Sequence, residues 1–207
     1  MLSEKPVVTF LDELASSAPA PGGGSAAALG AAIGAALVSM VANLTVGKKQ
    51  YLDVQADIQR ILGRSETLRH RCQDLLERDV AAYTQVSQVY KMPKDTDEQK
   101  AARAEAMQKA LKNATAVPME LAQVCVEVLE LCPEAAQKGN VNAVSDVGVG
   151  ALMAEAALRA AALNVLINLG SIKDEAFVQR EGAKLDALLA GKAQLKEQIV
   201  KDVEAKL

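Results

Sequence analysis

Apolar residues along this chain recur every three and four positions, the spacing of one face of an α-helix. The longest such run lies within 53–91 and passes through Ile58, Ile61, Ser65, Leu68, Cys72, Leu75, Asp79, Ala82, Val86 and Val89. A stripe of this kind predicts a long helix that buries one face in a bundle. No segment shows the strict alternation of apolar and polar residues that is typical of a strand.

Residues that favour helix ends place two helices before this one. A short helix is expected over 9–17, closed by the Pro- and Gly-rich turn 19–24. Ser25 is a good N-cap for a second helix over 25–46, which Gly47 ends.

Three more helices are expected after residue 91. The capping box at 96–99 predicts a helix that runs to Gly139, and Pro118 and Pro133 should each kink or break it. A further helix covers 147–169, with Gly170 as its cap. A capping box from Ser171 to Asp174 then opens a last amphipathic helix over 174–205.

The segments 25–46 and 147–169 consist largely of small residues. No charged residue occurs between Glu13 and Lys48. The segment 25–46 within this stretch is long enough to span a bilayer. It is nevertheless mostly Ala, Gly and Ser, and it lacks the Leu, Ile and Phe that drive membrane insertion. A buried central helix, which neighbouring backbones approach closely, is therefore the favoured interpretation.

The length and composition fit one all-α domain over 1–207, a bundle of five or six helices with two Ala/Gly-rich helices at its centre. A net charge of −3 argues against a broad basic surface for nucleic acid or a polybasic membrane anchor. The three cysteines form no CxxC pair, and no metal-ligand spacing is present. The N-terminus lacks the pattern of a signal peptide, so a cytoplasmic location is expected.

Asp79 is the residue that fits a plain bundle least well. Its heptad position continues Ser65 and Cys72, which places a carboxylate on the buried stripe. Such a group must be paired, cap another helix, or carry a pKa raised by desolvation. The last property would suit a general base near neutral pH, and the spacing alone leaves both kinds of role open.

Three other features could contact a ligand. Asn164 and Asn168 share one face of an aliphatic helix, where their amides could read a heterocycle edge or simply bond to a neighbouring helix. The Gly22–Gly24 loop before Ser25 exposes backbone N–H groups, although it also suits a flexible turn. Lysines near helix ends, including Lys48 and Lys94, could meet carboxylates or merely be solvated.

Several ordered motifs resemble one known family. They are PAPGGGSAAA at 19–28, SMVANLTVGKK at 39–49, DVAAY at 79–83, KMPK at 91–94, ATAVP at 114–118, Gly139–Asn140, Ser145–Asp146 and NVLINL at 164–169. Together they resemble the cyclodeaminase/cyclohydrolase family, the C-terminal domain of formiminotransferase-cyclodeaminase. The similarity covers about 9–180.

The resemblance implies an all-α homodimer that acts on tetrahydrofolate one-carbon adducts, without metal or redox cofactor. One branch hydrolyses 5,10-methenyltetrahydrofolate to the 10-formyl form, and another converts 5-formiminotetrahydrofolate to the methenyl form and ammonia. The chain carries no formiminotransferase half, which favours the first. A non-catalytic helical scaffold is the alternative from another class.

The resemblance also implies roles for individual residues. The catalytic aspartate of the family corresponds to Asp79. Substrate contacts are expected from Gly23, Gly24, Ser25, Lys48, Lys94, Asn140, Ser145, Asp146, Asn164 and Asn168. The amides and the Ser145–Asp146 turn would suit the pterin edge, and the lysines would suit the carboxylates of a polyglutamylated folate.

Overall fold

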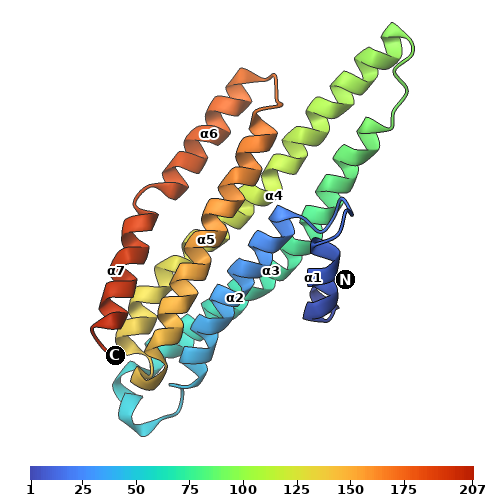
Figure 1. Cartoon of the computed structure of the whole chain (residues 1–207). Helices are drawn as coiled ribbons and strands as arrows, with labels where there is room; N and C mark the ends of the chain where they lie inside the picture. Colours follow the sequence, from blue (N-terminus) through green and yellow to red (C-terminus); the bar gives the residue numbers. More distant parts are fainter.

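The computed structural model describes residues 1–207, and all its regular elements are helices (Figure 1). The α-helices are α1 (Val7–Leu14), α2 (Gly23–Asn43), α3 (Gln55–Tyr90), α4 (Asp97–Lys138), α5 (Val144–Leu169), α6 (Glu175–Leu189) and α7 (Lys192–Glu204). Short 3₁₀ helices occupy η1 (Leu2–Glu4), η2 (Lys49–Val54) and η3 (Val141–Ala143). The predicted all-α class is confirmed.

Four long helices build the bundle. α2 packs against α3 and α5, and α4 packs against the same two helices. α6 and α7 return along one side of the bundle, whereas α1 lies on the other side near the start of α2 (Figure 1). The hairpin of α3 and α4 projects beyond the other helices at one end (Figure 1).

The predicted stripe of α3 forms part of the core. Ile58, Ile61, Ser65 and Cys72 are fully buried, and the stripe becomes half-buried at Asp79. α2 and α5 supply mainly Ala, Gly and Val to the same core. The core is therefore built from small side chains, which brings the helix backbones close together.

The closest approach joins α2 to α5. A Cβ built on Gly34 would lie 3.0 Å from the carbonyl oxygen of Gly150, and one built on Gly150 would lie 3.1 Å from that of Gly34. By length and composition, α2 and the η3–α5 segment could each span a membrane. More than half of α2 is buried inside the bundle, so the predicted buried central helix is confirmed.

Gly34→Leu should lower the free energy of unfolding by at least about 1–3 kcal/mol, because the added side chain overfills the contact with α5. Gly63→Leu is the matched control, since Gly63 lies in α3 with open space around it. Chemical denaturation of the two variants measures the difference. Equal stabilities would contradict the tight α2–α5 contact.

Several expected helix boundaries are wrong, including the end of α2, which lies at Asn43 and not at Gly47. α2 begins at Gly23 with Gly22 as N-cap, so Ser25 is its third residue and not its cap. The predicted helix 174–205 is two helices, because Gly191 adopts a left-handed conformation with φ of 72° between α6 and α7. Asp174 caps α6 by accepting from the Phe177 amide, and Ser171 lies outside that cap.

The prolines do not interrupt α4, which is continuous through Pro118 and Pro133. The expected break is therefore wrong. An internal proline costs about 3 kcal/mol in helix stability. Packing against α3 and α5 on both sides of α4 offsets that cost. The capping box at its start is confirmed, because Thr96 accepts from the Gln99 amide.

Candidate active site at the start of helix α2

Asp79 projects from α3 toward the N-terminus of α2. Its Oδ2 accepts a 2.7 Å hydrogen bond from the hydroxyl of Ser25, which is fully buried. No lysine, arginine or histidine forms an ion pair with Asp79 (the nearby Arg78 pairs with Asp74 and Glu120). The carboxylate is thus half-buried without a cationic partner.

The Gly22–Gly24 loop gives this carboxylate its space. A Cβ on Gly24 would overlap both oxygens of Asp79, so only glycine fits there without displacing the acid. The first N–H groups of a helix lack partners within the helix, and Gly22 supplies no side-chain cap. Asp79 lies at the position that such a cap would occupy, which agrees with one of the sequence-based interpretations.

Two opposing effects set the pKa of Asp79. Burial raises the pKa, because it disfavours the charged carboxylate. Hydrogen bonds from the Ser25 hydroxyl and amide lower it by a smaller amount. The net direction of the pKa is upward from the ordinary aspartate range, which makes the carboxylate a stronger base.

Asp79 opens onto a cavity of about 430 Å³ between α2, α3, α4 and α5. Its lining includes Gly22, Gly23, Gly24, Ala82, Tyr83, Val86, Tyr90, Leu111, Ala114, Pro118, Asn164, Ile167 and Asn168. Asp79 is the one charged residue in that lining. A largely apolar cavity with a single carboxylate and a few amides suits an aromatic heterocycle that carries reactive nitrogens.

Both predicted asparagines line this cavity. The Asn164 side chain donates from Nδ2 to the carbonyl of Ala160 at 2.8 Å, which leaves its Oδ1 as an acceptor beside Gly23. Asn168 forms no side-chain hydrogen bond within the chain, so its amide retains full donor and acceptor capacity. The structure therefore brings together Asp79, Gly23, Gly24, Asn164 and Asn168.

Pro118 adds a backbone acceptor that the sequence pattern did not indicate. Proline has no N–H, so the carbonyl of Ala114 one turn earlier loses its helical donor. Both residues line the cavity. A ligand N–H group is a suitable partner for that carbonyl.

A second cavity, of about 450 Å³, adjoins the first and shares Tyr90, Leu111 and Ser171 with it. Its lining contains four cations and no carboxylate; the cations are Lys94, Lys100, Arg103 and Lys173. Arg103 also lies over the Tyr90 ring at 5.9 Å from its centroid. The structure thus places Lys94 in a basic compartment next to the Asp79 cavity, in a chain whose net charge is negative.

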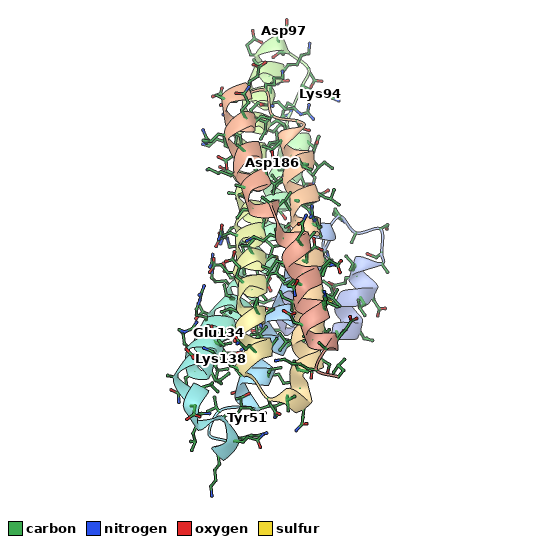
Figure 2. The ribbon with its side chains drawn as sticks, turned by 90° about the vertical axis from the view of Figure 1, so that its left-hand side faces the viewer. Tyr51, Lys94, Asp97, Glu134, Lys138 and Asp186 are labelled. Atoms are coloured by element: carbon green, nitrogen blue, oxygen red, sulfur yellow. The ribbon has the colours of Figure 1, made fainter.

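Four predicted site residues lie at the other end of the single chain. Ser145 and Asp146 begin α5, about 27 Å along the helix from Asn164 at 1.5 Å per residue. Lys48 follows the far end of α2. Figure 2 shows the two ends, with Lys94 at one and Tyr51, a contact of Asn140, at the other.

Asn140 takes part in a structural network at that far end. Its amide N–H donates to Thr45 Oγ1 at 2.8 Å, and its Nδ2 donates to the carbonyl of Leu44 at 3.1 Å. Its Oδ1 accepts from the Asn142 amide and from the Tyr51 hydroxyl. These bonds join the end of α2 to the turn between α4 and α5, so Asn140 has a clear structural role.

The largest cavity, about 630 Å³, lies between α4 and α6 and contains none of the predicted site residues. Each of its charged groups has an ion-pair partner: Lys112 pairs with Asp174, Glu120 with Arg78, and Glu181 with Lys184. Asp79 is unpaired, which makes the smaller cavity the better candidate.

Tyr90 and Lys173 are the main residues that the sequence interpretation missed. Tyr90 lies seven residues after Tyr83, so the two rings share one face of α3, and both line the Asp79 cavity. That spacing in a chain with only three tyrosines was an available signal. Lys173 comes from the α5–α6 connection, and its approach to α3 and α4 is a tertiary feature.

Comparisons with known proteins identify the family of this chain. The model of the formiminotransferase-cyclodeaminase family matches residues 6–187. A methenyltetrahydrofolate cyclohydrolase of Methylorubrum extorquens is 49% identical over 207 residues, with 100% of both chains covered. A formimidoyltransferase-cyclodeaminase of Sus scrofa is 37% identical over 188 residues, and the match covers 91% of this chain and 35% of the pig protein.

A solved structure supports the same assignment. The crystal structure of a formiminotetrahydrofolate cyclodeaminase from Thermotoga maritima superimposes with a TM-score of 0.88 at 31% identity, covering 99% of this chain and 98% of that one. The resemblance inferred from the sequence motifs is thereby confirmed. The chain belongs to the formiminotransferase-cyclodeaminase family.

Proposed function

We propose that the protein is a methenyltetrahydrofolate cyclohydrolase that interconverts 5,10-methenyltetrahydrofolate and 10-formyltetrahydrofolate. The observation that carries the proposal is Asp79, an unpaired acid at the edge of a cavity with no other charged group. The full-length similarity to a protein named for this activity favours it over the other reaction of the family.

The reaction centres on a carbon that bridges two nitrogens and carries positive charge. In the hydrolytic direction, water attacks this carbon and gives up a proton, and one carbon–nitrogen bond of the ring then breaks. Asp79 is the base for one water proton and returns it to the leaving nitrogen, and the second proton passes to solvent as the formyl C=O bond forms. Its negative charge also stabilises the cationic methenyl group. The carbon keeps its oxidation state, so the proposal requires no redox cofactor.

The assay that tests the proposal offers both family substrates to the purified protein. Loss of the methenyl chromophore, without ammonia release from 5-formiminotetrahydrofolate, is the expected result. Ammonia release would show the cyclodeaminase reaction, which the name of the Thermotoga maritima neighbour favours. Turnover of neither substrate would favour the non-catalytic scaffold.

We further propose that the glutamate tail of the folate occupies the basic cavity. This cavity begins at Tyr90, about 16 Å beyond Asp79 at 1.5 Å per residue along α3. A ligand whose ring system reaches Asp79 and whose carboxylates reach Lys94 and Lys173 would use both compartments. The pairing of lysine with carboxylate groups supports this orientation.

Binding of a polyglutamylated tetrahydrofolate should therefore weaken as salt rises, more than binding of the monoglutamate does. Salt screens exposed charge pairs beyond about 10 Å at 0.1 M. Lys94→Ala should shrink the difference between the two ligands and leave kcat nearly unchanged, because this contact is equal in the ground and transition states. Lys201→Ala on exposed α7 is the control. A salt-independent affinity would contradict the tail site.

We propose that the protein is a homodimer that uses the exposed faces of α2 and α5. Exposed apolar side chains follow α5 at Val149, Leu152, Leu163, Leu166 and Ile167, and others lie at Ile33 and Met40 on α2 and at Leu44 just after it. Leu163 and Ile167 are 68% and 71% exposed. Large exposed apolar side chains that gather on helix faces in this way are typical of a protein interface.

An ion pair in the middle of this stripe of exposed α5 side chains indicates that the surface faces another protein and not lipid. Arg159 is exposed there and pairs with Glu155 at 2.8 Å, whereas a charged pair on a lipid-facing helix surface would be costly. A two-fold axis that passes near this pair, perpendicular to α5, would set α5 antiparallel to α5 of the partner. The start of one α5 would then lie beside the end of the other.

This arrangement accounts for the site residues that lie far from Asp79 in the single chain. Ser145 of the partner subunit and Asp146 of the partner subunit would lie beside Asn168 at the edge of the cavity. By the same symmetry, Lys48 of the partner subunit would approach the turn 19–24. These three residues then join Asp79 and Asn168 in one site that two subunits share, and Asn140 keeps its structural role.

A further inference from the structure

We propose that Ser25 acts on Asp79 and not on the substrate: it is a positioning residue that fixes the carboxylate by donating a hydrogen bond to Oδ2. The catalytic part of this inference rests on the function proposed above. The geometric part depends only on the contact between α2 and α3.

Ser25 lies behind the carboxylate as seen from the cavity. It is fully buried, and it is absent from the cavity lining that includes Gly22, Gly23 and Gly24 immediately before it. Its hydroxyl donates to Oδ2 of Asp79 at 2.7 Å. A ligand in the cavity therefore meets Asp79, and Ser25 affects that ligand only through the acid.

The two oxygens of Asp79 have different surroundings. Oδ2 accepts from the Ser25 hydroxyl, whereas Oδ1 lies against Gly24, where an added Cβ would come within 2.1 Å of it. The absent side chain of Gly24 leaves the room in which the carboxylate adopts this orientation. A carboxylate fixed in one orientation meets water in a single direction, which reduces the reorganisation needed for proton transfer.

No cation in the cavity lining stabilises the charged form of Asp79. α4 contributes Leu111, Ala114 and Pro118 to the cavity, and α5 contributes Asn164, Ile167 and Asn168. The titratable groups beside Asp79 in the lining are Tyr83 and Tyr90, both on α3. Since neither is a cation, the hydrogen bonds from Ser25 are what stabilise the charged form of Asp79 against burial.

The test is the pH dependence of kcat for Ser25→Ala. Removal of a hydrogen bond to a charged group raises the pKa of the acid, by about 1 unit for a bond of ordinary strength. Because the base must be ionised, the acidic limb of the profile should move to higher pH by that amount. The plateau kcat should fall about 10-fold as orientation is lost. KM should stay within about 2-fold, since Ser25 does not touch the substrate.

Ser39→Ala is the matched control. Ser39 is also a buried serine of α2, and its hydroxyl donates to Ser65 at 2.8 Å, away from the cavity. The Ser39→Ala variant should lose a similar amount of free energy of unfolding as Ser25→Ala, and its pH profile should not shift. If Ser25→Ala does not fold, Ser25→Thr and Ser25→Val replace it, because these two variants add the same bulk and differ in the hydroxyl. The threonine variant should then keep the parent profile, and the valine variant should show the shift.

A carboxyl titration by ¹³C NMR, assigned with Asp79→Asn, separates this inference from the proposed function. If the parent turns over no folate, the function fails, yet the titration of Asp79 still reports the effect of Ser25. A raised KM with an unchanged profile would show that Ser25 binds substrate. An Asp79 titration and a pH profile that both remain unchanged in Ser25→Ala would overturn the inference.

Discussion

Asp79→Asn should lower turnover of the folate substrate by roughly 10²–10⁴, the usual contribution of a general acid–base group. Asparagine keeps the shape of aspartate, so it still fits against Gly24 and can accept from the Ser25 hydroxyl. The start of α2 should therefore stay intact while the proton acceptor is lost. A steady-state assay of the methenyl chromophore measures the effect.

The same variant makes a prediction about stability. Burial raises the pKa of Asp79 above that of the unfolded chain, so the ionised form destabilises the fold as pH rises through the folded-state pKa. Asp79→Asn removes that destabilisation, and its melting temperature near neutral pH should equal or exceed that of the parent. Low turnover together with a lowered melting temperature would point to damage of the fold.

The pH profile of the parent provides the control. A base is active when ionised, so turnover should fall as pH drops through the raised pKa of Asp79. The residual activity of Asp79→Asn should lack this limb. Retention of more than about half of the parent turnover would contradict the catalytic assignment.

The sequence predicted the helices well because their signals are local. The stripe that includes Ile58 and Cys72 and the capping box at Thr96 depend only on spacing along one helix. Asp79 was found in the same way, as a polar residue on an apolar face. The break at Gly191 was also encoded locally, but the amphipathic pattern continues across it and conceals it.

The rest of the site depends on contacts between distant segments. Ser25 was interpreted as a helix cap, because its sequence neighbourhood gives no sign that Asp79, 54 residues later, approaches it. The basic cavity gathers cations from the α3–α4 hairpin and from Lys173, which no periodicity links. Motif similarity predicts a substrate contact at Asn140, and only the structure shows that its hydrogen bonds hold a turn together.

Two inactive variants should restore activity when they are mixed, if the antiparallel dimer is correct. Asp146→Asn alone should lower kcat/KM about 10–100-fold, the effect of losing a hydrogen bond to a charged group. In a mixed dimer with Asp79→Asn, one site carries both substitutions and the other carries neither. Random exchange makes half of the dimers mixed, so a 1:1 mixture should recover about a quarter of parent activity.

The control for this experiment is a mixture of Asp79→Asn with Asp79→Ala, in which no dimer has an intact site and no recovery is expected. Leu163→Arg should convert the parent to a monomer in sedimentation, because a charge in the exposed stripe of α5 disrupts an apolar interface. The monomer and the Asp146→Asn variant should both lose turnover, since in each of them the active site lacks a side chain that the partner subunit supplies. Full activity of a monomeric Leu163→Arg protein would show that a single chain holds the whole site.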